Sequence, residues 1–269
     1  MTEHAEKHCQ TALITGASAG IGRELAIVFA EQGFNLVVVA RRRHELDALA
    51  AALKADREIE VTVIVADLTA PSAPQTLFET VQRLGIEVDV LVNNAGINFY
   101  GDFKDIPLEN HLSLIQLNIG ALTALTHLYV RPMVERGYGR ILNVASISAF
   151  QPIPTIAVYA ASKAFVVSFS EALAVELRET GVMVTALCPG FTETAMKSIE
   201  SATTGHPASL PAFTVGDASQ VARDGYRACM QGEVLCVSGL LNQLATFWMQ
   251  HQPRWLGRTL GGWFKQWVS

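Results

Sequence analysis

Three polar residues in the middle of the chain have types and spacings suited to moving one proton. Tyr159 precedes Lys163 by four positions, and Ser146 lies shortly upstream of both. Residues at i and i+4 share one face of a helix, so the phenol and the ammonium are expected in the same space. An adjacent ammonium lowers the pKa of a phenol, which otherwise titrates near ~10, and a serine hydroxyl can hold a carbonyl oxygen against it. The alternative is an ordinary surface contact between Tyr159 and Lys163.

Composition limits the classes of protein to be considered. The 269 residues are half hydrophobic and 17% charged, which is typical of a globular chain, and the net charge of −5 argues against general nucleic-acid binding. The cysteines Cys9, Cys188, Cys229 and Cys236 are widely spaced, so we predict reduced, packing thiols and no metal site. The polar N-terminus lacks a secretory core, and no apolar stretch reaches the ~18 residues of a membrane span. We therefore expect a cytoplasmic protein.

The elements that must position the polar trio alternate between strand and helix. Strands are predicted at Thr11 to Thr15, Asn35 to Ala40, Val61 to Ala66, Val88 to Asn93, Arg140 to Ala145, Val182 to Cys188 and Glu233 to Val237. Helices are predicted at about 21–32, 43–55, 73–84, 108–135, 158–180 and 217–231. The strands are continuous apolar runs, which indicates burial on both faces. This pattern predicts an α/β fold with a doubly wound parallel sheet and helices on both faces.

Two regions interrupt the alternation. Residues 191–215 are rich in Ser, Thr, Gly and Pro and are predicted to form a loop that acts as a lid. We assign residues 1–239 to one catalytic domain and 240–269 to a helical extension that contains four tryptophans. From His251 onward this tail has basic residues and no acidic one, which fits an interfacial amphipathic helix. It fits equally a helix that packs on the same domain or on a partner subunit.

A glycine-rich turn follows the first strand and opens the first helix. The stretch TGASAGIG, residues 15–22, contains Gly16, Gly20 and Gly22. Glycines permit a tight turn and a close approach to a pyrophosphate, and the helix N-terminus offers N–H groups to the phosphates. The placement favours a dinucleotide site over an ordinary turn. The remaining cofactor contacts predicted in this turn are Ser18, Ala19 and Ile21.

The end of the second strand predicts which dinucleotide binds. Arg41, Arg42 and Arg43 follow Ala40, where an acidic residue would instead bind the ribose of NAD. A guanidinium suits a 2′-phosphate. We predict NADP(H) rather than NAD(H), with Arg41 as the main contact, Arg42 as a helper and Ser18 adding a hydroxyl. The alternative is that the arginines only solvate the start of a helix.

Further candidates stand at the ends of later strands. Asp67 follows the third strand and could receive the adenine amino group beside the Leu68 N–H, and the run Asn93 to Gly96 follows the fourth. Small residues there allow the backbone to pass close to a ribose. The predicted cofactor contacts in this run are Asn94, Ala95 and Gly96. Each has an alternative explanation as turn chemistry.

Taken together, these motifs resemble the short-chain dehydrogenase/reductase family. The resemblance runs from about Ala12 to Val237 and adds to the residues above Asn118, Pro189-Gly190, Thr192 and Thr194. It implies a single Rossmann-type domain with a seven-stranded parallel sheet. It also implies hydride transfer between a nicotinamide and a carbonyl or alcohol.

The resemblance also implies roles for individual residues. Tyr159 corresponds to the catalytic acid/base, Lys163 to the residue that lowers its pKa and holds the nicotinamide ribose, and Ser146 to the residue that orients the substrate oxygen. Asn118 corresponds to a residue that kinks its helix and holds a water of a proton relay. The residues expected to frame the nicotinamide and the nearby phosphates are Pro189, Gly190, Thr192 and Thr194. One departure is Ala19, where many NADP-preferring relatives carry a basic residue.

The substrate side of the site is predicted from apolar residues. Ser148 is a rival for Ser146, although the spacing to Tyr159 favours Ser146, and His111 and His127 are left out as packing or surface residues. The segment Asn98 to Phe103, the segment after Ser146 and the 191–215 loop should set specificity. Their apolar residues are Phe99, Tyr100, Phe150, Ile153, Phe191 and Met196. They favour a lipophilic carbonyl, or else they simply close the core.

Three functions remain open at this point. The first is an NADPH-dependent oxidoreductase acting on a lipophilic ketone or aldehyde, and the second is a 3-oxoacyl-thioester reductase. The third is a catalytically silent NADP(H)-binding sensor or scaffold, although such proteins usually lose the Tyr or the Lys. The expected partners are a small-molecule substrate and further copies of the chain in a homodimer or homotetramer. Membrane contact through the tail is the less favoured expectation.

Overall fold

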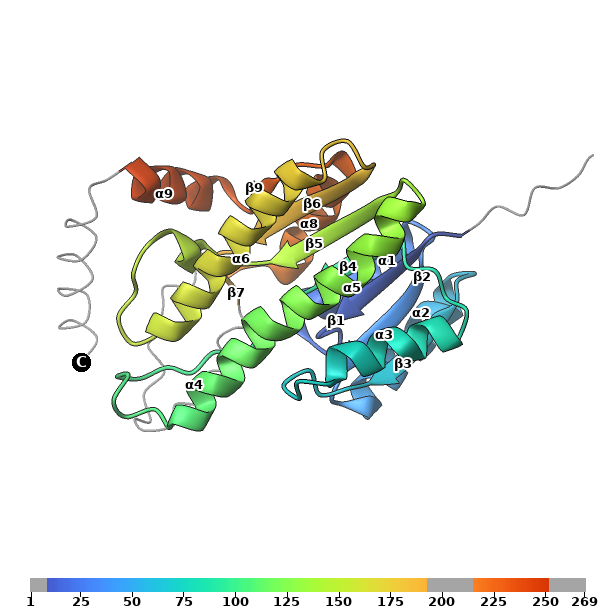
Figure 1. Cartoon of the computed structure of the whole chain (residues 1–269), viewed down its shortest axis with the longest axis horizontal. Coiled ribbons are helices and arrows are strands. Elements are labelled where there is room, and N and C mark those ends of the chain that lie inside the picture. Colours follow the sequence, from blue (N-terminus) through green and yellow to red (C-terminus); the bar gives the residue numbers. More distant parts are fainter. Residues whose placement is uncertain (1–8, 193–214, 252–269) are drawn as a thin grey trace, which may run out of the picture.

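The computed structural model describes residues 9–192 and 215–251 (Figure 1). Within them, seven strands form one parallel sheet in the order β3-β2-β1-β4-β5-β6-β9. This order confirms the predicted seven-stranded, doubly wound Rossmann-type sheet. The strands are β1 (Thr11–Thr15), β2 (Asn35–Ala40), β3 (Val61–Val65), β4 (Val90–Asn93), β5 (Gly139–Val144), β6 (Val182–Cys188) and β9 (Leu235–Val237).

Two strands begin later than predicted, for local reasons. β4 begins at Val90 because the Val88 carbonyl accepts a hydrogen bond from the Arg136 side chain rather than from a neighbouring strand. β9 begins at Leu235 because the Glu233 N–H donates to the Ala228 carbonyl, at 2.9 Å, and closes the end of the preceding helix. Hydrogen bonds made by flanking residues therefore set these strand ends.

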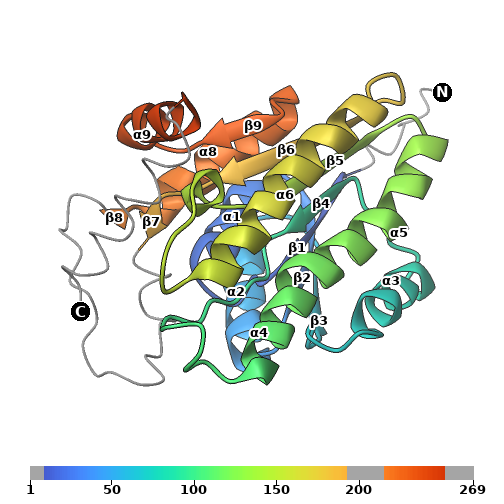
Figure 2. The same ribbon diagram turned by 60° about the vertical axis from the view of Figure 1, so that its left-hand side comes forward.

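Helices cover both faces of the sheet (Figures 1 and 2). One face carries α1 (Gly20–Glu31), α2 (Arg43–Asp56) and α8 (Ala218–Gln231). The other carries α3 (Ala73–Arg83), α6 (Ala157–Glu176) and a long helix composed of α4 (Leu108–Ile115), the π-helical η1 (Gln116–Ala121) and α5 (Leu122–Glu135). The short 3-10 helix η2 (Ile147–Phe150) follows β5, and α9 (Leu240–His251) follows β9.

The apolar side chains of the strands and helices pack into two core layers, one on each face of the sheet. Leu25, Phe29 and Leu46 pack with the sheet on one side, and Leu125 and Met133 pack with it on the other. The helix Leu108–Glu135 and α6 are also long and apolar enough to cross a membrane by length and composition. In this fold their inner faces belong to the core, which accounts for that hydropathy.

Two predicted boundaries need correction. The helix predicted over 158–180 ends at Glu176, because the Thr180 hydroxyl donates to the Leu177 carbonyl and Gly181 takes a positive φ of 80°. The predicted 191–215 loop begins and ends in short strands, β7 (Phe191–Thr192) and β8 (Val215–Gly216), which pair in parallel. Thr194, Met196 and the rest of the predicted lid lie outside the described residues.

Candidate active site

The predicted site residues lie along the carboxyl edge of the sheet. β1, β4, β5 and β6 are consecutive neighbours, so the segments that follow them meet at one edge (Figure 2). Ser146 follows β5, and Pro189-Gly190 follows β6. α6, which carries Tyr159 and Lys163, packs beside β6 and η2. A parallel topology therefore gathers residues that are far apart in sequence.

Lys163 is the buried cation of the site. Its side chain is 5% exposed, and its Nζ donates a hydrogen bond to the Val144 carbonyl at 2.8 Å. Burial lowers the pKa of Lys163 to about 8, with the nearby Cys188 thiol acting in the opposite direction. A buried ammonium is costly unless it is paired, so part of the lysine population is neutral near physiological pH.

Tyr159 stands one helical turn before the lysine. The Lys163 Nζ lies 5.6 Å from the centroid of the Tyr159 ring, so the two side chains do share a face as predicted. Burial raises the pKa of the Tyr159 phenol, and a hydrogen bond with the Ser146 side chain acts in the opposite direction. The net direction is opposite to the lowering that the i,i+4 spacing predicts, because burial penalises the phenolate more than its surroundings stabilise it.

Ser146 and Ser148 differ in their surroundings. Ser146 caps η2, and its Oγ accepts a hydrogen bond from the Ser148 N–H at 3.1 Å. Ser148 is buried, and its hydroxyl finds no partner among the described residues. The contact of Ser146 with Tyr159 places Ser146 next to the phenol, in agreement with the spacing argument.

Asn118 lies within the π-helical segment η1, where the long helix departs from α geometry. Its Oδ1 accepts from the Ile97 N–H at 2.9 Å, and its Nδ2 donates to the Ile97 carbonyl at 3.0 Å and to the Ser162 Oγ at 3.2 Å. π-Bulges are frequent at functional sites. Through these bonds, Asn118 links the long helix to the segment after β4 and to α6.

Gly96 lies close to the side chains of both Asn118 and Lys163. A Cβ on Gly96 would lie 3.3 Å from the Asn118 Oδ1 and 3.6 Å from the Lys163 Nζ. The glycine therefore lies against two of the predicted catalytic side chains. Its neighbour Ala95 donates its N–H to the Thr15 Oγ1 at 3.0 Å, which holds this segment against the end of β1.

The glycine-rich turn is packed too tightly for side chains. Gly16 and Gly20 adopt positive φ values of 69° and 59°. A Cβ on Gly22 would lie 2.3 Å from the Asn94 Nδ2 and 2.5 Å from the Gly16 carbonyl oxygen. Asn94 donates to the Thr15 carbonyl at 2.8 Å, so its side chain supports the turn. This turn opens α1, as a pyrophosphate-binding turn requires.

The predicted 2′-phosphate contacts also come together. The Arg42 Nη2 donates to the Ser18 Oγ at 3.1 Å, although the same guanidinium lies 3.6 Å from the Glu45 carboxylate. Burial tends to raise the pKa of Asp67, but hydrogen bonds from Thr69 and the charge of Arg41 outweigh it and lower that pKa. Arg41 therefore lies near the end of β3 as well as the end of β2.

One carboxylate oxygen of Asp67 is hydrogen-bonded within its own turn. Its Oδ1 accepts from the Thr69 N–H at 3.0 Å and from the Thr69 hydroxyl at 2.8 Å. The neighbouring Leu68 is buried in the core beneath the sheet edge. The second carboxylate oxygen of Asp67 lies at the exposed edge, where the predicted adenine contact would be made.

The segment after β6 is fixed from two sides. The Pro189 carbonyl accepts from the Ile147 N–H at 3.0 Å, and a Cβ on Gly190 would lie 2.5 Å from the Asn242 Nδ2 of α9. Thr192 is in β7. Across residues 9–192 and 215–251, no group of His, Cys, Asp or Glu side chains is arranged to hold a metal ion.

Comparison with known proteins identifies the family. A family model described as short chain dehydrogenase matches residues 10–204. The chain belongs to the short-chain dehydrogenase/reductase family. The very-long-chain 3-oxoacyl-CoA reductase of Homo sapiens is 33% identical over 202 residues, which are 73% of this chain and 64% of that protein. The chain thus spans less than two thirds of that relative's length.

Two solved structures of this family are similar over most of the chain. A short-chain dehydrogenase from Sphingobium yanoikuyae in complex with NADPH has 31% identity and a TM-score of 0.79, and the match covers 91% of this chain and 96% of that one. A bulky-bulky ketone specific alcohol dehydrogenase from Comamonas testosteroni has 31% identity and a TM-score of 0.76, covering 91% and 95%. The relatives are oxidoreductases, and the fold binds a nicotinamide cofactor.

In this short-chain dehydrogenase/reductase, several residues that support the site were not predicted from the sequence. Thr15 ties the glycine-rich turn to the segment after β4, and Ser162 ties Asn118 to the Tyr159 carbonyl. Asn242 packs on Gly190 from beyond the predicted catalytic domain. Ser162 has a signal in the sequence, since it lies one turn from Tyr159. Asn242 has none, because its contact depends on where α9 docks.

Proposed function

We propose that the chain is an NADP(H)-dependent oxidoreductase that transfers hydride between the nicotinamide and a carbonyl or secondary alcohol. The observation that carries the proposal is the meeting of Gly96, Asn118 and Lys163 beside Tyr159 and Ser146, at the edge where the glycine-rich turn opens α1. A proton donor and a nucleotide turn at one edge are what carbonyl reduction requires. Gly16 and Gly22 fit the cofactor because side chains there would occupy the turn.

In the reductive direction, the Ser146 and Tyr159 hydroxyls donate hydrogen bonds to the substrate oxygen. When bound, NADPH supplies hydride to the carbonyl carbon. Negative charge then develops on the oxygen, and Tyr159 transfers its proton there, which completes the alcohol and leaves a phenolate. The raised pKa of Tyr159 keeps the phenol protonated before the step. The protonated Lys163, 5.6 Å from the ring, stabilises the phenolate. Lys163 would then return a proton by way of a water that Asn118 holds.

NADP(H) is preferred in this proposal because three cationic or hydroxyl side chains gather where a 2′-phosphate would lie. Ser18 and Arg42 are hydrogen-bonded, and Arg41 lies near Asp67. Arg41→Glu should reduce the preference for NADPH over NADH by ~10–100-fold, as expected for a lost charge-assisted hydrogen bond. Arg43→Glu, on the next residue, is the matched control and should keep the preference. An Arg41→Glu enzyme that still prefers NADPH as strongly would reject the assignment.

A lipophilic ketone or aldehyde is the proposed substrate. Phe99 and Tyr100, after β4, and Phe150 and Ile153, after β5, are half-buried. The Gly101 N–H donates to the Thr155 carbonyl at 3.0 Å and joins the two segments. These apolar segments flank the predicted substrate oxygen position. The Comamonas testosteroni neighbour, described as specific for bulky-bulky ketones, is consistent with this substrate class.

The alternative within the same chemistry is a 3-oxoacyl-thioester reductase, which the human relative favours. A carrier- or CoA-bound substrate would favour a basic surface beside the pocket. The nearby Lys104 lies 3.3 Å from the Asp105 carboxylate and is next in sequence to acidic and apolar residues. This local charge is balanced, so the ketone or aldehyde remains the first proposal.

The deciding experiment is a panel of bulky ketones, aldehydes and 3-oxoacyl thioesters assayed with NADPH and with NADH. The proposal expects the highest kcat/KM with a lipophilic ketone or aldehyde and NADPH. A thioester preference would select the alternative. Tight NADPH binding without turnover of any substrate would instead support a silent sensor or scaffold.

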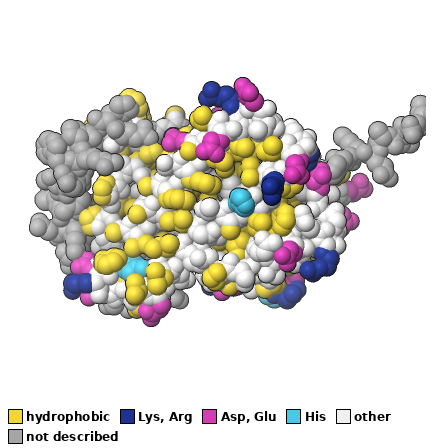
Figure 3. All heavy atoms as spheres, viewed as in Figure 1, with side chains coloured by type: hydrophobic (Ala, Val, Ile, Leu, Met, Phe, Trp, Pro, Cys, Tyr) yellow, Lys and Arg dark blue, Asp and Glu magenta, His cyan; other side chains and the backbone are white. Residues whose placement is uncertain are grey.

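The proposal includes a cytoplasmic homodimer or homotetramer. Apolar side chains are spread over the face formed by α4, α5 and α6 (Figure 3). The exposed members on α4 and α6 include Leu108, Leu112, Ile115 and Phe165. A face of this kind suits a second copy of the chain. Sedimentation velocity should therefore show an oligomer, and Leu112→Lys should shift it toward the monomer.

A further inference from the structure

The helix α9 is oriented with its polar side toward the protein. Asn242 and Thr246, one turn apart, face the domain, and Thr246 is only 3% exposed. The Asn242 Nδ2 donates to the Ser238 carbonyl at 2.8 Å, and the Thr246 Oγ1 donates to the Asn242 carbonyl at 2.8 Å. A surface helix of a globular protein normally turns its apolar stripe to the core. The orientation of α9 is the reverse.

The outward side of α9 is apolar except for Gln243. Leu240, Leu244 and Trp248 are spaced four residues apart, so they form one stripe, and they are 77%, 68% and 54% exposed. Leu241 lies beside them and is also exposed. The helix has no charged residue between Leu240 and Gln250. It lies beyond the carboxyl edge of the sheet, at the end of the molecule away from the start of β1 (Figure 1).

The sequence that contains this stripe has a charge opposite to that of the chain. From Gly239 to Ser269 the basic residues are Arg254, Arg258 and Lys265, and no aspartate or glutamate occurs, although the whole chain carries −5. All four tryptophans, Trp248, Trp255, Trp263 and Trp267, fall within the same stretch. Exposed leucines, tryptophans and cations without acids are the composition that binds anionic lipid interfaces.

We propose that the outward face of α9, with the basic residues that follow it, docks on an anionic phospholipid surface. Leu240, Leu241, Leu244 and Trp248 would enter the interface, and Arg254, Arg258 and Lys265 would supply the attraction to the headgroups. The partner is selected by the combination of exposed apolar side chains, tryptophans and cations without an acidic residue, which is the composition of an interfacial lipid-binding segment. The docking is peripheral, because α9 is too short to span a bilayer.

The test is flotation of the full chain with vesicles of phosphatidylcholine alone or with phosphatidylserine. The wild type should float with the anionic vesicles, and its tryptophan emission should shift to the blue, since every tryptophan lies in the proposed segment. Leu241→Gln/Leu244→Gln should lose flotation. The matched control is Leu84→Gln/Val175→Gln, which removes two exposed apolar residues elsewhere and should float normally. Circular dichroism checks that each variant is folded.

The contribution of the three basic residues to lipid binding is measured separately. Replacing Arg254, Arg258 and Lys265 together by Gln should weaken partition into anionic vesicles by ~100-fold, since each cation near such a surface contributes about fivefold. Equal binding to neutral vesicles would overturn the proposal. So would failure of the wild type to float, or α9 substitutions that change only the oligomeric state and so identify a second copy as the partner.

Discussion

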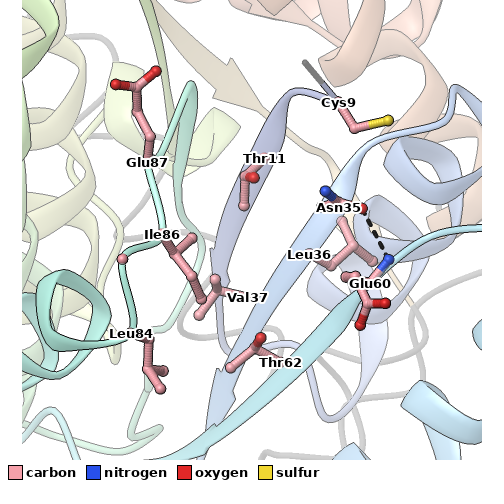
Figure 4. Close-up of a pocket in the computed structure, with 11 residues that line it drawn as sticks. Cys9, Thr11, Asn35, Leu36, Val37, Glu60, Thr62, Leu84, Ile86 and Glu87 are labelled. Carbon is pink, nitrogen blue, oxygen red and sulfur yellow. Dashed lines mark hydrogen bonds between the residues drawn. The ribbon is translucent and has the colours of Figure 1, made fainter. Parts of the chain in front are cut away.

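The two edges of the central sheet differ in what they offer a ligand. At the amino edge, an open cavity of about 470 Å³ is lined by the starts of β1, β2 and β3 and by the turn after α3 (Figure 4). Cys9, Glu60 and Glu87 are among its lining residues, and the Asn35 Oδ1 is bonded to the Glu60 N–H at 2.8 Å. At the carboxyl edge, a buried lysine, a tyrosine, a serine and an asparagine meet beside a glycine-rich turn.

In this sheet, therefore, an open volume alone does not identify the functional edge. The amino edge has volume, but its polar groups belong to separate strand starts and do not converge on one reacting position. The carboxyl edge has convergent groups, because each strand there leads into a segment that turns over the sheet. The predicted function therefore belongs to the edge that gathers unlike side chains, and substitutions at the two edges should have unequal effects.

The largest effect is expected at Tyr159. Tyr159→Phe removes the proton donor and keeps the ring, so turnover should fall by ~10²–10⁴-fold. NADPH affinity, measured by fluorescence titration, should change little. Tyr138→Phe, on a tyrosine before β5, is the control and should keep full activity. Undiminished turnover in Tyr159→Phe would remove the carboxyl-edge mechanism.

The next effect is expected at the glycine-rich turn. Gly22→Ala places a Cβ 2.3 Å from the Asn94 Nδ2 and 2.5 Å from the Gly16 carbonyl oxygen, so the backbone of the turn must move. We expect a loss of stability of ~1–3 kcal/mol and at least tenfold weaker NADPH binding. The measurements are urea denaturation and cofactor titration.

Gly33→Ala is the matched control for the turn. Gly33, unlike Gly22, has a positive φ, of 80°, but a Cβ there would meet nothing within 4 Å. It should cost ~1 kcal/mol of backbone strain and leave NADPH affinity unchanged. Equal loss of cofactor binding in both glycine variants would show that the turn has no special role.

A pH profile tests the buried lysine. Lys163 has a pKa lowered to about 8, so its ammonium is present below that pH and is lost as the pH rises through it. If the protonated lysine stabilises the phenolate, kcat/KM for reduction should fall about tenfold per pH unit above about 8. A profile that stays flat through this range would separate Lys163 from the proton-transfer step. Lys163→Arg, if active, should shift the fall to higher pH because arginine keeps its charge.

The smallest effect is expected at the amino edge. Cys9→Ser and Glu60→Gln alter residues that line the cavity without touching the carboxyl edge. Both should leave kcat/KM within about twofold and stability within ~0.5 kcal/mol. A large loss of activity in either variant would mean that the two edges are coupled.

Much of the fold could be predicted because its signals are local. Continuous apolar runs indicate buried strands, and their alternation with amphipathic segments leads to a doubly wound sheet. The strand Val182–Cys188 was predicted at its observed ends, whereas β9 was not. The difference is that the start of β9 depends on how Glu233 closes α8, and a run of apolar residues does not reveal such a hydrogen bond.

The identity of the reactive side chains, their order along the chain and their placement after successive strands can be read from the sequence alone. Their electrostatic state and their partners depend on the tertiary fold. The i,i+4 spacing predicts a lowered pKa for Tyr159, but burial raises it and lowers that of Lys163. Asn118 is committed to Ile97 and Ser162, and α9 turns its leucines outward. These outcomes depend on the solvation and contacts of each group, which residues distant in the sequence supply.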